Sequence, residues 1–172
     1  MADHSPDLIT DELTRDQIRS VYPLIREAVP TIDLPSWLRF AQQLTAPRRA
    51  GQCGIIVARR GGRAFPSGLF CYRVEGDLQL GKVLIAEHFV AIDLLDPGGV
   101  LTALVEQLDV LAKRLDCGAV RSVVHGGASD IEDGLHAAGH RPEGALLLKR
   151  FLHASHGPRG FHEAPVNPVT AG

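Results

Sequence analysis

The chain has 172 residues, of which 45% are hydrophobic and 22% are charged, and its formal net charge is −2. This length and composition suit one domain with a substantial core, and a globally disordered protein is not expected. The sequence has no long block of Lys or Arg. Neither nucleic acid nor an anionic membrane is therefore expected as the main partner.

The N-terminal residues, the apolar runs and the cysteines bear on the cellular compartment of the protein. Residues 1–7 lack the basic start and the apolar stretch of a signal peptide, and the longest apolar run, residues 89–95, is too short to span a bilayer. The sequence has no Cys-x-x-Cys pair, so no metal site is expected. The three cysteines are widely spaced in or beside apolar segments: Cys53, Cys71 and Cys117. Small core thiols of this kind are typical of a reducing compartment, which predicts a cytoplasmic protein.

The N-terminal third predicts a short strand and then helices. Leu8–Thr10 is the candidate strand. Thr14 and Gln17 form a capping-box pattern before an apolar period of helical spacing. Pro23 interrupts that period and should kink or split the helix. A second helix is expected to begin at Pro35, because proline is favoured in a first helical turn.

The middle of the chain predicts an antiparallel meander of three strands, residues 53–60, 65–75 and 78–95. Gly61-Gly62 reads as a two-residue hairpin turn, and Gly76-Asp77 is expected to turn the chain again. The third strand is rich in Val, Ile and Leu, which is typical of a strand buried on both faces near the centre of a sheet.

The last third alternates between helix and strand. A long apolar stripe follows Asp96-Pro97-Gly98-Gly99 and predicts a helix that Gly118 ends in a left-handed conformation. Next come a strand at residues 119–125, a helix that Ser129 and Glu132 open as a capping box and that ends at Gly139, a strand at residues 145–152, and a flexible tail at residues 153–172.

This order predicts an α/β fold. A mixed sheet would combine an antiparallel meander with a central strand-turn-helix, flanking helices and at least one parallel crossover. Residues 1–152 would form one domain. The glycine turn at residues 96–99 opens a helix, where backbone N–H groups can hold a phosphate. The alternative is a tight strand-to-helix connection without a ligand.

The element order and two motifs resemble the GCN5-related N-acetyltransferase (GNAT) family. Residues 95–104, LeuAspProGlyGlyValLeuThrAlaLeu, are similar to the family's strand end and acetyl-CoA pyrophosphate loop. Residues 135–144 are similar to its late helix and Gly-Phe turn, with His140 where Phe is usual. The resemblance covers residues 8–152 and implies a GNAT-like fold.

The resemblance also implies a cosubstrate, acetyl-CoA or another acyl-CoA, and an amine acceptor. The residues placed at the cofactor by this resemblance are Leu95, Gly98, Gly99, Val100 and Leu101. In the family the loop begins with Arg or Gln and ends with Gly or Ala. Here the segment after Pro97 is shorter, and Leu101 stands at the last position.

Of the family's two catalytic positions, the base keeps its residue type in this chain and the acid does not. Its base is often a Glu of the central strand, which implies Glu87, and an apolar strand would raise the pKa of that carboxyl by desolvation. In the alternative, Glu87 lies at a strand bulge and faces solvent or pairs with an arginine. The family's acid, a Tyr, corresponds to Leu135, so His125 at a strand end is the candidate replacement. His88 and Tyr72 are further candidates.

Two functions of different class follow. The first is an N-acyltransferase that moves an acyl group from acyl-CoA to an amine, the acceptor being bound by variable loops. The second is a non-catalytic GNAT-like domain that binds a ligand or a partner protein. In either case an uncovered edge strand would favour a homodimer.

Overall fold

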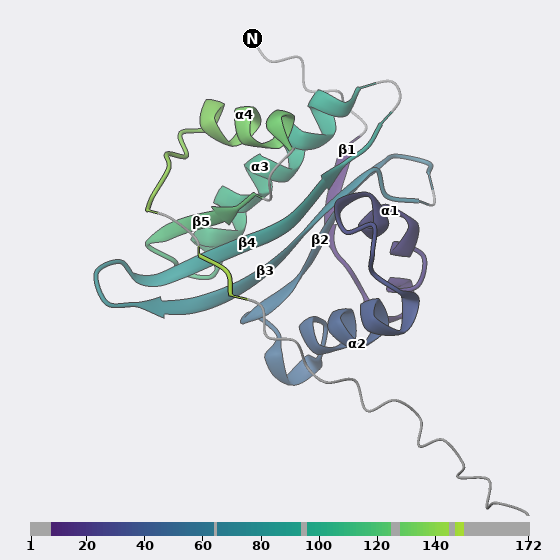
Figure 1. Cartoon of the computed structure of the whole chain (residues 1–172), viewed down its shortest axis with the longest axis horizontal. Coiled ribbons are helices and arrows are strands. Elements are labelled where there is room, and N and C mark those ends of the chain that lie inside the picture. Colours follow the sequence, from purple (N-terminus) through teal and green to yellow (C-terminus); the bar gives the residue numbers. More distant parts are fainter. Residues whose placement is uncertain (1–7, 64, 94–95, 125–127, 145–146, 150–172) are drawn as a thin grey trace, which may run out of the picture. The chain divides into compact units, whose positions relative to one another are not determined.

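The computed structural model describes residues 8–63, 65–93, 96–124, 128–144 and 147–149. The described residues up to Arg141 form one compact unit, and the described residues from Pro142 to Lys149 belong to a second. Every described helix and strand belongs to the first unit (Figure 1). Among the described residues, no helix is both long enough and apolar enough to cross a bilayer.

Five strands form one mixed sheet in the order β1-β2-β3-β4-β5. Adjacent strands are antiparallel except for β4 and β5, which run parallel. The helix α3 makes the crossover between those two. The strands are β1 (Leu8–Glu12), β2 (Cys53–Arg60), β3 (Gly68–Asp77), β4 (Gly81–Ala91) and β5 (Ala119–Val123). The helices are α1 (Tyr22–Ala28), α2 (Leu34–Leu44), α3 (Pro97–Arg114) and α4 (Ser129–Ala137), with the short 3-10 turns η1 (Arg15–Gln17) and η2 (Pro47–Arg49).

Helices cover both faces of the sheet, with α3 and α4 on one face and α1 and α2 on the other (Figure 1). Alternate residues of the strands fill the two cores, as a period of two requires. In β2, for example, Ile56 packs in the core beneath α3, whereas Ile55 and Val57 pack in the core beneath α1 and α2. The predicted mixed α/β fold with a meander and a parallel crossover is confirmed.

The N-terminal predictions are confirmed in their local chemistry. The backbone N–H of Thr14 donates to the side chain of Gln17 over 3.3 Å, as a capping box requires. Pro23 splits the predicted helix, since only η1 precedes it and α1 begins beside it. Pro35 lies in the first turn of α2, which Asp33 caps through its carboxylate.

The predicted turn at Gly61-Gly62 is too short. The strand β3 begins at Gly68, so the return strand does not start at Phe65 as predicted, and Phe65 is exposed. Pro66 has no N–H group and therefore cannot donate a hydrogen bond to the neighbouring strand. The first bond back to β2 beyond it comes from the N–H of Ser67.

The predicted turn at Gly76-Asp77 is wrong, because β3 continues through both residues. The carboxylate of Asp77 accepts from the N–H groups of Gln79 and Leu80, over 2.9 and 3.0 Å. This side-chain turn moves the reversal to residues 78–80. The third strand is consequently shorter than the predicted residues 78–95.

Three C-terminal predictions also need correction. The left-handed residue after α3 is Asp116, with φ of 56°, and not Gly118. The predicted capping box at Ser129 and Glu132 does not form, because Ser129 is already the first helical residue and Ala128 precedes the helix. In the predicted strand at residues 145–152, the described residues Leu147–Lys149 are not in a strand. The remainder of that range and the tail at residues 153–172 lie outside the described residues.

Candidate active site

A bulge in β4 is the first feature of the candidate site. Cys71 of β3 pairs with Glu87 of β4, but further along the ladder one residue of β3 lies opposite two of β4, His88 and Phe89. His88 has a positive φ of 57°. An extra residue in a left-handed conformation bends a strand and redirects its side chains, and such bulges are common next to active sites.

The parallel ladder between β4 and β5 ends at the same place. Its last pair joins Glu87 to Val123, while β4 continues to Ala91. A cavity of about 280 Å³ lies beyond that pair, and we call it the bulge cavity. Its walls come from α1, β4, the end of β5 and α4, and its polar side chains among the described residues are Glu27 and His88.

A larger cleft of about 760 Å³ lies between α3 and α4, and we call it the α3–α4 cleft. Pro97, Gly98 and Thr102 line it from the start of α3. It shares three lining residues with the bulge cavity: Ala91, Ala128 and Ile131. The two hollows therefore adjoin, and together they lead from the first turn of α3 to the bulge at His88.

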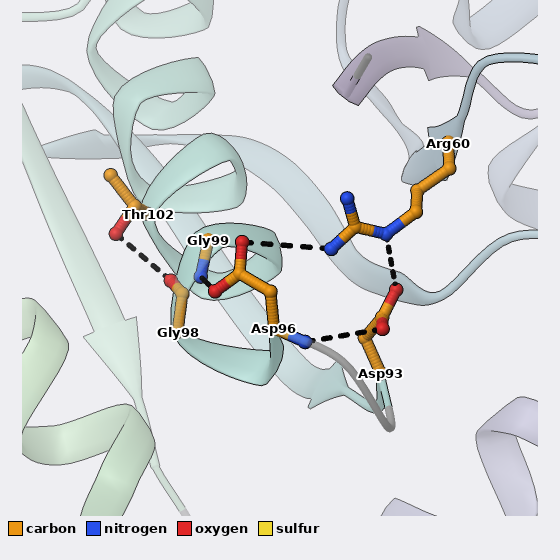
Figure 2. Close-up of polar contacts among 6 residues, drawn as sticks. All are labelled: Arg60, Asp93, Asp96, Gly98, Gly99 and Thr102. Atoms are coloured by element: carbon orange, nitrogen blue, oxygen red, sulfur yellow. Dashed lines mark hydrogen bonds and ion pairs between the residues drawn. The ribbon is translucent and has the colours of Figure 1, made fainter. Parts of the chain in front are cut away.

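The first turn of α3 is capped from within the chain (Figure 2). One oxygen of the Asp96 carboxylate accepts from the N–H of Gly99 over 2.8 Å. The contact is so close that a Cβ added at Gly99 would lie 2.1 Å from the other oxygen of that carboxylate, so any larger residue would displace the carboxylate from this cap. Asp96 also uses its carbonyl, which accepts from the N–H of Val100 over 3.4 Å.

Arg60 of β2 holds this cap in place (Figure 2). Its Nε lies 2.7 Å from the carboxylate of Asp93, and its other guanidinium arm lies 3.5 Å from the carboxylate of Asp96. Asp93 is only 8% exposed and also accepts from the N–H of Asp96 over 3.3 Å. One guanidinium thus ties two carboxylates to the sheet, which fixes the start of α3.

The predicted cofactor residues divide into three groups. Gly98 and Leu101 line the α3–α4 cleft, and Leu101 is mostly buried against Gly134 of α4. The N–H groups of Gly99 and Val100 already donate to Asp96. Leu95 lies outside the described residues.

The structure agrees with the alternative for Glu87, in which this residue lies at a strand bulge and pairs with an arginine. Its Oε1 lies 2.6 Å from the guanidinium of Arg73, and Glu87 is not among the described residues that line either hollow. The neighbouring His88 does line the bulge cavity. Its Nε2 is 4.0 Å from Glu87 Oε1, and its ring packs edge-on against Phe40 of α2.

The remaining positions considered for a proton donor have structural roles or lie outside the described residues. His125 lies outside them, although Val124 before it lines the bulge cavity. Leu135 of α4 is buried in the core against α3, so the position at which the family has a Tyr offers no proton donor in this chain. Tyr72 donates its hydroxyl to Glu12 over 2.9 Å, and burial, followed by the Glu12 carboxylate, raises the pKa of this phenol.

Cysteine chemistry is not supported at this site. Cys53 and Cys71 are buried and Cys117 is half-buried, and all three are free thiols. Burial, reinforced by the charge of Glu87, raises the pKa of the Cys71 thiol far above its usual range. A protonated, enclosed thiol is a poor nucleophile, which agrees with the prediction that these residues fill the core.

Sequence reasoning named His88 only as a further candidate, and it did not find the network that holds the start of α3. The prominence of His88 arises from the bulge, which is a relation between two strands, and its only local signal was a histidine directly after Glu87. The network of Arg60, Asp93 and Asp96 joins residues far apart in the sequence. No single-sequence pattern marks such a contact.

Comparisons with known proteins agree on the architecture. No family model matches the sequence, and no curated protein sequence is significantly similar to it. Solved structures match it well. An aminoglycoside N-acetyltransferase, AAC(6')-Iy, in complex with CoA has a TM-score of 0.71 at 11% identity, over 88% of this chain and 99% of that one.

Two further structures match over a similar length. A ribosomal-protein-alanine N-acetyltransferase from Brucella melitensis biovar Abortus 2308 has a TM-score of 0.68 at 14% identity, over 84% of this chain and 99% of that one. A transcriptional regulator from Bacillus halodurans C-125 has a TM-score of 0.70 at 16% identity, with the same two coverages. The chain therefore has the fold of the GCN5-related N-acetyltransferases, the family that its motifs resemble.

Proposed function

We propose that the protein is an N-acyltransferase that moves an acetyl or other acyl group from acyl-CoA to an amine. The observation that carries the proposal is the pair of adjoining hollows, one at the first turn of α3 and one at the β4 bulge. A transfer reaction needs two substrates whose reacting atoms meet, and two hollows with a common wall meet that need. The similar structures, one of them holding CoA, support the same assignment.

The acyl-CoA would occupy the α3–α4 cleft. A volume of about 760 Å³ is in the range of cofactor-sized sites. The start of α3 carries the positive end of the helix dipole and faces this cleft through Gly98, which suits a phosphorylated ligand. The thioester would then point along the shared wall at Ala91 towards the bulge cavity.

The acceptor amine would enter the bulge cavity, where Glu27 can attract its ammonium form. For reaction, the amine loses a proton and its nitrogen attacks the thioester carbonyl carbon. The C–S bond then breaks, the nitrogen gives up its second proton, and the CoA thiolate leaves and is protonated. The products are the N-acyl amine and CoA.

The proton steps would fall to residues around the bulge. His88 lines the cavity and accepts the amine proton through its imidazole. Glu87, whose Oε1 lies 4.0 Å from His88 Nε2, stabilises the imidazolium that forms and so acts through its neighbour. His125, which directly follows the cavity residue Val124 in sequence, protonates the leaving thiolate in this scheme.

A direct test is an assay of thiol release from acetyl-CoA, with a panel of small amines and lysine-containing peptides as acceptors. We expect turnover with at least one amine, with N-acetyl product confirmed by mass spectrometry. Release of CoA without an acylated amine would show hydrolysis only. No turnover together with no binding of any acyl-CoA would refute the proposal.

The second candidate is a binding domain without catalysis. The Asp96 carboxylate favours it, because Asp96 occupies the Gly99 N–H that a pyrophosphate would use and brings negative charge to that position. A structure described as a transcriptional regulator has the same fold, which is consistent with this alternative. Saturable binding of CoA, without turnover for any amine, would favour it.

Replacing Asp96 by Asn separates the effect of its charge from its role as a cap. Asn caps helices as well as Asp does, so the fold should be kept. Loss of one negative charge close to the pyrophosphate should raise the affinity for CoA about fivefold at low salt. Calorimetric titration measures this, with Asp109→Asn, an exposed acid farther along α3, as the matched control. Weaker binding of CoA by the Asp96 variant would contradict the prediction.

A further inference from the structure

An open groove lined by arginines lies apart from the two hollows of the candidate active site and shares no described lining residue with them. It has a volume of about 560 Å³ and is formed by η1, α2, η2 and the segment between the last two. Three arginines from three different elements line it: Arg15, Arg39 and Arg48. We call it the arginine groove.

The arginines of this groove differ from the arginines that form ion pairs elsewhere in the described chain. Five arginines elsewhere lie within 4.0 Å of a carboxylate, namely Arg59, Arg60, Arg73, Arg114 and Arg121. Among the described residues, no carboxylate lies that close to the three arginines of the groove. The guanidinium of Arg39 instead donates to the hydroxyl of Ser36 over 3.2 Å. The nearby Asp33 carboxylate is held by the N–H of Ser36 at the start of α2.

The described lining of the groove also contains no acidic side chain. Gln42 and Gln43 of α2 contribute amide donors and acceptors, and Pro47 contributes an apolar surface. All three arginines are exposed, and the described lining places no carboxylate opposite them, although the Asp33 carboxylate at the start of α2 attracts the charge of Arg39. Guanidinium groups bind carboxylates through two parallel hydrogen bonds, which makes arginine well suited to acidic ligands.

We propose that the arginine groove binds an acidic peptide segment of a partner protein. Its open form suits an extended chain better than a small molecule, because small-molecule sites enclose most of the ligand. Gln side chains can bond to the backbone of an extended peptide while the arginines bind its carboxylates. Nucleic acid fits less well, since the chain has a net charge of −2 and binding to a phosphate backbone relies on many cationic contacts.

This binding does not depend on acyl transfer, so it is tested without any acyl donor. The probe is a fluorescein-labelled hexaglutamate peptide, titrated with the full chain and followed by fluorescence anisotropy at low salt. Each of Arg15→Gln, Arg39→Gln and Arg48→Gln should weaken binding about threefold, and the triple variant about thirtyfold, as expected for exposed ion pairs. Added salt should weaken binding by the wild type and leave little difference between the proteins.

The matched control replaces three exposed cations outside the groove, Arg26, Arg63 and Lys113, by Gln, which changes the net charge equally. This control should bind hexaglutamate as the wild type does. An equal loss in both triple variants would show a diffuse charge effect and overturn the proposal. So would the absence of binding, or tighter arginine-dependent binding of an oligothymidylate of the same length.

Discussion

Replacing His88 by Asn is expected to lower kcat for amine acylation by about 10²–10⁴-fold, the usual contribution of a general base. The affinity for CoA should stay the same, because His88 lines the bulge cavity and not the α3–α4 cleft. Asn is the suitable replacement since it tolerates the positive φ at this position and cannot accept the amine proton at neutral pH. The loss should shrink at high pH, where the amine is already deprotonated.

The matched control is His136→Asn on α4. His136 is also partly exposed but is not among the described residues of either hollow, so its replacement should leave kcat within about twofold. Glu87→Gln should give an intermediate loss of about tenfold, since Glu87 acts on the imidazolium and not on the substrate. An unchanged kcat in the His88 variant, at any pH, would remove His88 from the reaction.

Replacing Gly68 by Ala should lower the free energy of unfolding by about 2–3 kcal/mol, as overpacking of a close contact does. A Cβ at this position in β3 would lie 2.6 Å from Val100, 2.8 Å from the carbonyl oxygen of Val90 and 2.9 Å from Leu104. The side chains belong to α3 and the carbonyl to β4, so the added methyl would push the helix from the sheet. Because α3 also lines the α3–α4 cleft, the shift of this helix should change the shape of the cleft as well as lower stability.

The same strand supplies the control. Gly76 lies in β3, and a Cβ added there would meet no atom within 4 Å. The free energy of unfolding of Gly76→Ala should therefore stay within about 0.5 kcal/mol of the wild-type value. Urea denaturation measures both variants, and the midpoint should fall only for Gly68→Ala. Equal midpoints in the two variants would show that α3 does not pack so closely on β3.

Regular elements were readable from the sequence where local chemistry decides them. The capping box at Thr14, the split at Pro23 and the start of α2 all follow from residues within one or two turns. Turns were predicted less well, because Gly76-Asp77 has the composition of a turn. The carboxylate of Asp77 nevertheless bonds to residues beyond it and moves the reversal. The composition of this segment predicted that a turn lies near residue 77, but not that the chain reverses at residues 78–80.

The candidate site was less predictable, since its features depend on contacts across the sheet. Glu87 lies on the central strand as predicted, and the alternative in which it pairs with an arginine could be stated from the sequence, but that its partner is Arg73 of β3 could not. The glycine turn was predicted at residues 96–99, yet nothing in it indicates that the Asp96 carboxylate accepts a hydrogen bond from the Gly99 N–H while Arg60 holds that carboxylate. These contacts decide how a phosphate could bind, and they exist only in the folded chain.

The most direct test of the proposed function is calorimetric titration of the full chain with acetyl-CoA and with free CoA. Binding with a dissociation constant on the order of 1–100 µM is expected. Gly98→Leu should weaken it at least about tenfold, because a bulky side chain would fill the α3–α4 cleft. Its Cβ would meet no atom nearer than 3.9 Å, so the fold should be kept. No binding of either ligand, or unchanged binding by the Gly98 variant, would contradict an acyl-CoA site in this cleft.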